Sequence, residues 1–278
     1  MDKLMKLDRR IIYFVMLVLV SLPLLSPLGI PLLITQGTRD MYEQLAAVPA
    51  GSRVLFSINY DPTSAPDIAP QAVVMLDHLM SNNVNVALVC FSAAGPNLIE
   101  GLMAPHLAAG KVYGEDLVNL GFIAGAETAI RNFGRDVIGT AKADYHGNDL
   151  KSMPILDGVT DVRDFELVVV FHGYNPGVQE WIRQVQGPLD IRLLAGVVSV
   201  SVPEVMPFYT SGQLAGLTQG LRGAAEYELL IDKPGTAVAK MDAQSLGHLA
   251  IIFFIVIGNI GYFSTKGKSK AKKEGGEN

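Results

Sequence analysis

The chain has 278 residues, 49% of them hydrophobic, and a formal net charge of −5 at pH 7. Its two ends carry a net charge of +5 and the stretch between them −10, which argues against nucleic acid as a partner because phosphate binding uses clustered Lys and Arg. The single cysteine, Cys90, excludes an intramolecular disulfide framework.

An uncharged apolar run at residues 11–34 follows a ten-residue basic tail. The basic residues of this tail are Lys3, Lys6, Arg9 and Arg10. About 20 apolar residues cross the hydrocarbon core of a bilayer, so we predict a transmembrane helix at 11–34 and a cytoplasmic tail at 1–10. Pro23, Pro27 and Pro31 predict that the outer half of this helix is kinked or unwound. A cleaved signal peptide is the alternative, but no A-x-A-like cleavage site follows, which favours an uncleaved anchor.

The central region, residues 35–245, alternates between predicted strands and predicted helices. Continuous apolar, β-branched runs predict strands buried on both faces at residues 53–60, 84–91, 167–172 and 191–200. Helices are predicted between them, at residues 68–80, 97–108, 126–133 and 178–186. This alternation predicts an α/β fold, a Rossmann-like doubly wound parallel sheet with right-handed crossovers. We interpret the less regular stretch 111–163 as an inserted lobe.

Polar residues follow the predicted strands at the edge where ligands bind in doubly wound sheets. They include Asp61, Ser92, His172, Asn175 and Glu204. These five residues are our candidate ligand-binding site, and the alternative is that they are ordinary polar loop residues.

The sequence predicts no catalytic residues, no metal site and no cofactor. A histidine followed by glycine after a strand, as at His172, occurs in caspase-like cysteine proteases, whose nucleophilic Cys ends the next strand. Residues 196–201 contain no Cys, and no G-x-S-x-G elbow accompanies the histidine. The five histidines are scattered, and neither a Walker sequence nor G-x-G-x-x-G is present.

Residues 205–221 form a 17-residue segment without a charge. Gly212, Gly216 and Gly220 recur at every fourth position, which would place them on one face of a helix. Small residues at this spacing let another backbone approach closely. We therefore predict a helical interface through these glycines, either with another subunit or the membrane surface, or with the chain's own sheet.

A second apolar run at residues 246–264 precedes a Lys-rich tail at 265–278. It predicts a second transmembrane helix. Since basic flanks stay on the cytoplasmic side, both termini are predicted to be cytoplasmic and the central domain to lie outside the cell membrane.

Several stretches resemble an uncharacterised prokaryotic family of two-span membrane proteins with an extracytoplasmic α/β domain. These are GSRVLFSINYDPTSAPDI, KVYGEDLVNLGF, YTSGQLAGLTQGLRGAAEYE, and MDAQS with the span after it. The resemblance covers most of the chain and implies the two-span layout, but it implies no activity and no site residues.

From these features we expect a non-catalytic, membrane-anchored subunit of a membrane protein complex, whose domain serves as an assembly module. Its expected partners are membrane lipid and either further copies of the chain, as a homo-oligomer, or other membrane subunits. The alternative is a small-ligand-binding or sensory domain that uses the strand-end site. A membrane-anchored hydrolase is a third hypothesis, with His172, Asp61 and Ser199 as its candidate residues.

Overall fold

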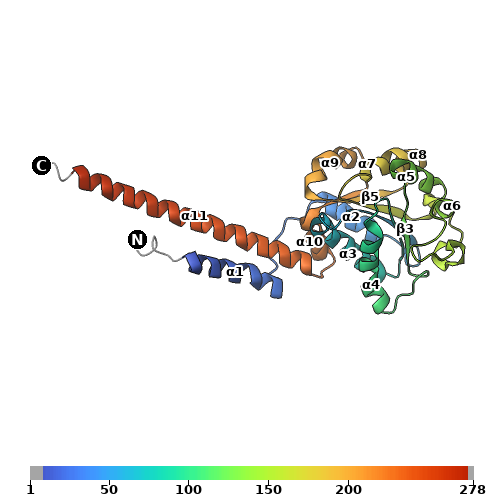
Figure 1. Cartoon of the computed structure of the whole chain (residues 1–278), viewed down its shortest axis with the longest axis horizontal. Helices are drawn as coiled ribbons and strands as arrows, with labels where there is room; N and C mark the ends of the chain where they lie inside the picture. The colour runs from blue at the N-terminus through green and yellow to red at the C-terminus, as the bar shows by residue number, and fades with distance from the viewer. Residues whose placement is uncertain (1–8, 275–278) are drawn as a thin grey trace. The chain divides into compact units, whose positions relative to one another are not determined.

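The computed structural model describes residues 9–274, which divide into two compact units. One unit is the α/β domain, Leu32–Lys233, and the other contains the helices before and after it in the sequence (Figure 1).

The α/β domain is built on a six-stranded, all-parallel sheet with the strand order β3-β2-β1-β4-β5-β6. The strands are β1 Arg53–Asn59, β2 Asn85–Cys90, β3 Leu117–Phe122, β4 Leu167–His172, β5 Leu193–Val197 and β6 Gly216–Gln219. Every paired neighbour is parallel, so the predicted Rossmann-like α/β fold is confirmed. The four strands predicted from sequence are β1, β2, β4 and β5.

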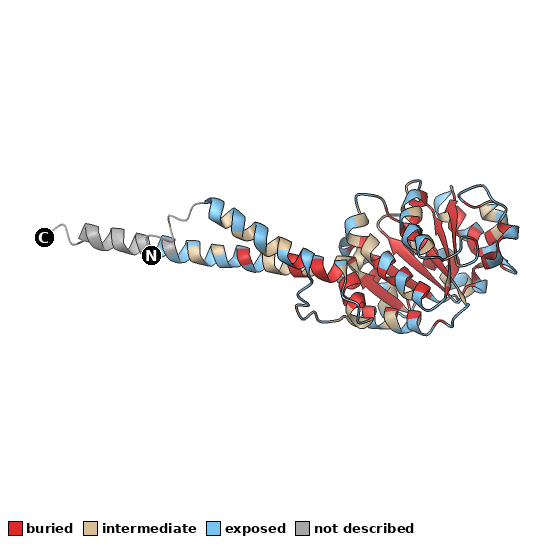
Figure 2. Ribbon diagram, turned by 90° about the horizontal axis from the view of Figure 1, so that it is seen from below, coloured by how far each residue is buried: buried red, intermediate tan, exposed pale blue. Residues whose placement is uncertain are grey.

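Helices cover both faces of the sheet (Figure 1). One face packs against α2 Gln36–Ala46, α3 Ala65–Ser81, α4 Gly95–Ala108 and α10 Gly220–Leu230. The other packs against α5 Ala126–Arg135, α7 Val178–Trp181 with its continuation Ile182–Gln186, and α9 Val202–Thr210. The remaining short helices are α6 Val137–Ala141, α8 Gly187–Leu189, and the turns Leu150–Ser152, Pro154–Leu156, Val162–Asp164 and Ser199–Ser201. The strands are buried almost throughout, as doubly covered strands must be (Figure 2).

The stretch 111–163 is part of the same domain rather than a separate lobe. Its first regular element is β3, which pairs with β2 in the sheet. Leu150, Ile155 and Val162 from its later part join the hydrophobic core on one face of the sheet.

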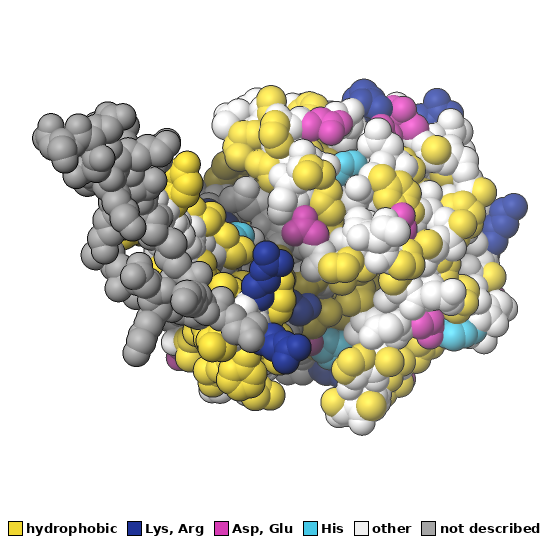
Figure 3. All heavy atoms as spheres, turned by 60° about the vertical axis from the view of Figure 1, so that its left-hand side comes forward, with side chains coloured by type: hydrophobic (Ala, Val, Ile, Leu, Met, Phe, Trp, Pro, Cys, Tyr) yellow, Lys and Arg dark blue, Asp and Glu magenta, His cyan; other side chains and the backbone are white. Residues whose placement is uncertain are grey.

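On the face drawn in Figure 3, hydrophobic side chains are interspersed with charged ones of both signs.

The predicted glycine-striped helix over residues 205–221 is wrong. The segment contains the end of α9, a turn, β6 and the start of α10. Gly212 lies in the turn with φ +82°, Gly216 begins β6, and Gly220 begins α10 with φ +53°. The glycine spacing misled the prediction because two of these glycines supply left-handed backbone between elements and do not share a helix face.

The second unit contains α1 Arg9–Leu25 and α11 Thr236–Glu274, which lie side by side (Figures 1 and 2). Within the described residues, Thr236–Ile260 is the one helical segment whose length and composition would suit a membrane span. The 17 residues of α1 cover about 26 Å, less than the roughly 30 Å of a hydrocarbon core. One candidate span is thus shown and not two, because the helix predicted over 11–34 ends at Leu25 and Pro27 and Pro31 follow in non-helical backbone.

A buried carboxylate orders the chain that follows α1. Asp242 of α11 is 2% exposed and accepts hydrogen bonds from the backbone N–H groups of Leu28, Gly29 and Ile30 at 2.8–3.1 Å. Three backbone donors outside regular structure thereby gain a charged acceptor. This carboxylate connects the end of α1 to α11.

Candidate functional site

The carboxyl ends of β1 and β4 form the point where the strand order reverses, which is where ligands bind in open α/β sheets. Asp61, Ser92 and His172 lie at the ends of the adjacent strands β1, β2 and β4, as predicted. Asn175 lies in the loop after β4, and Glu204 lies in the first turn of α9. Among the described residues, no hydrogen bond joins any two of these five side chains.

His172 is a buried ionisable group at this edge. It is 3% exposed, and its Nδ1 atom has no hydrogen-bond partner among the described residues. The backbone of Gly177 lies against the ring, so that a Cβ at this glycine would be 1.8 Å from Nδ1. Burial lowers the pKa of His172, against the opposing effect of the carboxylates of Glu204 and Glu180. The imidazole is therefore neutral near pH 7, with one nitrogen enclosed by the loop after β4.

Asn59 lies beside His172 on the same face of the sheet, because the two residues pair in register on parallel strands. Its side chain donates to Ser57 Oγ at 2.9 Å and accepts from the N–H of Phe91 at 3.0 Å. Ser57 Oγ also accepts from Trp181 Nε1 at 3.0 Å. The hydrogen bonds of Asn59 and Ser57 thus connect β1 to the end of β2 and to α7.

Asp61 stabilises the turn between β1 and α3. Its carboxylate accepts from the backbone N–H groups of Ser64 and Thr63 and from both of their hydroxyls, at 2.7–3.1 Å. These hydrogen bonds, led by that of the Ser64 N–H, lower the pKa of Asp61 to about 2.

Two residues of α3 that the sequence analysis missed connect the far strands. Asp67 accepts from the N–H groups of Ser199 at 2.7 Å and Leu221 at 3.0 Å. Gln71, which is fully buried, donates to the carbonyl of Val197 and accepts from the Thr218 hydroxyl. The loops after β5 and β6 are thereby fixed to α3.

The contacts of Asp61 and Asp67 limit which ligands can bind at the N-terminus of α3, the helix that follows β1. In dinucleotide-binding folds, the helix after the first strand receives a pyrophosphate at its N-terminus. Here, Asp61 and Asp67 place two carboxylates at that end of α3, and both already accept backbone N–H groups. The two carboxylates would repel a phosphate, and the N–H groups that they accept from are not available to bind one, so this end of the helix is unsuited to phosphate.

The remaining predicted residues have separate surroundings. Ser92 is buried, and its hydroxyl has no partner among the described residues. Asn175 is exposed, while Glu204 is exposed and accepts from the side-chain amide of Gln179. Ser199 donates to Asp67 at 3.2 Å, so the hydrolase candidates do not form a Ser–His hydrogen bond.

The three candidate interface glycines also separate. A Cβ at Gly216 would lie 2.7 Å from Met41 Cα, so its close neighbour is the chain's own α2. A Cβ at Gly220 would meet Ser199 Oγ at 1.9 Å, whereas Gly212 has no heavy atom within 4 Å of that position.

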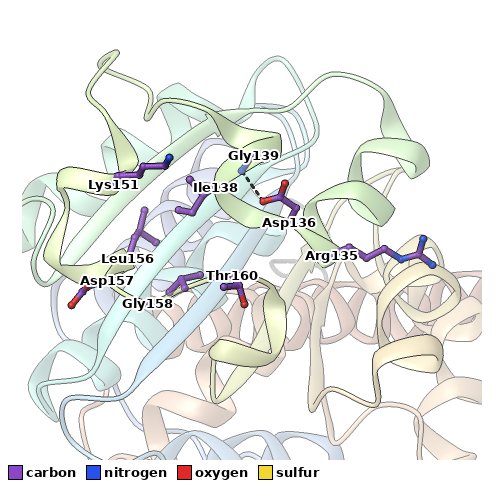
Figure 4. Close-up of a pocket in the computed structure, with 10 residues that line it drawn as sticks. Arg135, Asp136, Ile138, Gly139, Lys151, Leu156, Asp157, Gly158 and Thr160 are labelled. Carbon is purple, nitrogen blue, oxygen red and sulfur yellow. Dashed lines mark hydrogen bonds between the residues drawn. The ribbon is translucent and has the colours of Figure 1, made fainter.

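A broad hollow of about 730 Å³ lies between the α5–α6 junction and residues 151–160 (Figure 4). Arg135, Lys151, Asp136 and Asp157 are among its lining residues, and Asp136 accepts from the N–H of Gly139 at 2.8 Å. The ionisable groups of both signs that line it are exposed. The hollow therefore contains no buried charge or isolated polar group that would select a ligand.

A smaller pocket of about 200 Å³ lies between the start of α2, α9 and the end of β6. Its lining is largely apolar and contains no charged residue. We call it the α9 pocket; its lining residues are Thr35, Gln36, Gly37, Val202, Met206, Tyr209, Leu217 and Gln219.

An ion pair between a partly exposed arginine and a buried glutamate fixes the entrance of the chain into the domain, and the sequence analysis missed it. Glu226 of α10 is fully buried and accepts from the N–H and hydroxyl of Thr35 and from the hydroxyl of Thr38, at 2.7–3.0 Å. Arg222 pairs with Glu226 at 2.7 Å and donates to the carbonyl of Leu33. The spacing of Arg222 and Glu226, four residues apart, was a signal in the sequence for the pair but not for its partners.

Among the described residues, no group of three or more His, Cys, Asp or Glu side chains is arranged to hold a metal ion. Comparisons with protein-family models, with curated proteins and with solved structures find no match for this chain.

Proposed function

We propose that this chain is a non-catalytic, membrane-anchored subunit of a membrane protein complex, in which the α/β domain is an interaction module. The anchor consists of α1 and α11, and its expected surroundings are membrane lipid together with further copies of the chain or other membrane subunits.

The observation that carries this proposal is the apolar surface of the helix pair. Large apolar side chains of α1 and α11 that are between 47% and 85% exposed are Ile11, Tyr13, Phe14, Leu17, Leu22, Leu24, Leu25, Leu249, Ile251, Ile252, Phe253, Ile255, Val256, Ile260, Tyr262 and Phe263. Contiguous apolar surface of this kind is unstable in water and is covered by lipid or by other protein.

The topology follows from charge. Basic residues precede α1 and dominate the end of the chain after the second apolar run. Since Lys and Arg beside a span stay inside, we expect both termini to be cytoplasmic and the domain to lie outside the cell membrane, which requires α1 to cross the membrane as well as α11. Residues 26–34 after α1, which are uncharged, extend the apolar stretch beyond the 17 helical residues.

Several polar side chains of the strand-end edge bond other groups of the domain. Asp61, Asp67 and Asn59 are each bound to groups of the chain itself, and no nucleophile is hydrogen-bonded to His172 within the described residues. These side chains serve the architecture of the sheet edge.

A small-ligand-binding or sensory domain is the second candidate, and two orphaned atoms favour it. Nδ1 of His172 and Oγ of Ser92 are buried without partners among the described residues, and such groups cost free energy unless a water or ligand binds them. The test is stabilisation of the purified chain by added metabolites, which His172→Asn and Ser92→Ala would remove.

The main proposal is tested by extracting the full chain from native membranes into lipid nanodiscs and measuring particle mass. A discrete particle heavier than one chain supports it, and a monodisperse monomer contradicts it. For topology, Ser211→Cys and Ser269→Cys are made separately in a Cys90→Ala background. An impermeant thiol reagent on intact cells should label the exposed position 211 and spare 269; labelling of 269 would contradict cytoplasmic termini.

A further inference from the structure

We infer that the α9 pocket is a binding site for a small, uncharged aromatic or branched aliphatic group that carries one hydrogen-bonding atom. This inference does not depend on the proposed assembly role.

The size of the pocket sets the size of the ligand. Its volume is about 200 Å³, whereas an apolar cavity of about 150 Å³ holds one benzene molecule. Pockets for drug-sized ligands and nucleotides begin at about 300 Å³. A single ring system, such as phenol or indole, therefore matches this volume.

The lining sets the chemistry. Val202, Met206 and Tyr209 of α9 form one wall, and Leu217 of β6 contributes to another. Because the lining contains no charged side chain, an ionic ligand would lose its hydration without gaining a partner. The favoured ligand is uncharged and buries apolar surface.

The rim supplies the hydrogen bond. The side-chain amide of Gln219 has no hydrogen-bond partner among the described residues. Gln36 uses its Nε2 to bond Asp40 at 2.7 Å, which leaves its carbonyl oxygen as an acceptor. One apolar pocket with a few converging polar groups is the usual design of a small-molecule site.

The pocket is held open by the fold itself. Asp40 joins its two walls, since it accepts from the hydroxyl of Tyr209 on α9 and from Gln36 on α2. At the base, α2 approaches β6 so closely that a Cβ at Gly37 would lie 2.4 Å from the carbonyl oxygen of Leu217. Walls fixed in this way reduce the ordering cost of binding. The pocket also lies at the carboxyl end of a strand, on the edge where α/β sheets bind ligands.

The test uses the full chain in lipid nanodiscs, titrated with indole in a calorimeter against empty nanodiscs as the baseline. We expect saturable binding in the wild type. Met206→Trp, which fills the pocket from a side chain that is 37% exposed, should weaken binding about tenfold or more. Val200→Trp is the matched control, because Val200 is 87% exposed and outside the lining, and it should bind as the wild type does.

The hydrogen-bonding part is tested with 1-methylindole, which lacks the N–H donor. The wild type should bind indole more tightly than 1-methylindole, and Gln219→Met should remove this preference. No saturable binding of indole, or equal titrations of Met206→Trp and Val200→Trp, would overturn the site. Particle mass measured on the same samples reports separately on assembly: a monomer that binds indole contradicts only the proposed function, and a large particle that does not bind contradicts only this inference.

Discussion

Gly216→Ala should destabilise the domain because the new methyl group has no room. Gly216 begins β6, and an ideal Cβ there lies 2.7 Å from Met41 Cα, 2.8 Å from Met41 N and 2.8 Å from Leu194 Cδ2. Two of these three atoms belong to the backbone of α2, which cannot rotate away as a side chain could. Either α2 must move off the sheet or β6 must shift along β5.

The magnitude follows from two opposing terms. Overpacking of this kind costs about 1–3 kcal/mol. Since φ at Gly216 is not positive, alanine can adopt its backbone conformation, and the reduced entropy of the unfolded chain returns about 0.4–1 kcal/mol. The expected net loss is about 1–2 kcal/mol, or a decrease in melting temperature of roughly 2–8 °C for a domain of this size.

Gly101→Ala is the matched control with the opposite sign. Gly101 lies inside α4, is exposed, and has no heavy atom within 4 Å of an added Cβ. The same substitution should therefore stabilise the domain by about 0.5–1 kcal/mol through helix propensity. Unfolding is followed by the fluorescence of Trp181, the single and fully buried tryptophan. If Gly216→Ala melts at or above the wild type while Gly101→Ala is stabilised, the close contact between α2 and β6 is refuted.

Three further predictions concern buried polar groups. Because burial lowers the pKa of His172, the unfolded chain binds the proton more strongly than the folded chain. The free energy of unfolding is therefore highest above about pH 6.5 and falls on acidification. In urea titrations between about pH 7.5 and 5.5, His172→Asn should flatten the dependence of the unfolding free energy on pH, and an unchanged dependence would contradict the prediction. Asp242→Ala leaves three N–H groups without their acceptor and should loosen the helix pair. The assay is the rate of disulfide formation between cysteines placed at Val20 and Gly247 in a background without Cys90, because a Cβ at Gly247 would lie 3.7 Å from Val20 Cγ2. The substitution should slow this reaction, and equal rates would show that the carboxylate does not order the helix pair. Glu226→Ala removes the acceptor of the two threonines at the start of α2 and should cost about 1–3 kcal/mol in urea unfolding, whereas a stability equal to the wild type would refute the role given to this carboxylate.

The sequence was sufficient to predict the central strands because these strands are buried on both faces of the sheet. β1, β2, β4 and β5 are almost continuous runs of apolar residues, whereas a strand with one face in water would alternate apolar and polar residues. The two edge strands lacked such a run. β3 contains Asn119, whose buried amide donates to Glu100 and to the carbonyl of Pro96, and β6 has four residues with Thr and Gln among them. Their polar residues are satisfied by partners that only the folded chain brings near.

The sequence predicted which side chains lie at the strand-end edge but not which groups they bond. The edge of the sheet that holds Asp61 and His172 follows from strand direction alone. The roles of Asp67 and Gln71 do not, because they bond residues more than 120 positions away, on strands whose order the sequence does not encode locally. The α9 pocket was hidden for the same reason, since its walls come from residues near 36, 206 and 218.

The ion pair of Arg222 and Glu226 has a mechanical consequence. The incoming chain is bound to α10 through Leu33 and Thr35, and the outgoing chain leaves from the carboxyl end of the same helix. Tension along either connection therefore reaches α10 first, and α10 is packed against α3 on one face of the sheet. To extract α10, a pulling force would have to break several charge-assisted hydrogen bonds and a packed helix contact together, rather than peel one strand at a time. We therefore expect the domain to unfold cooperatively when force is applied through the segments that connect it to α1 and α11.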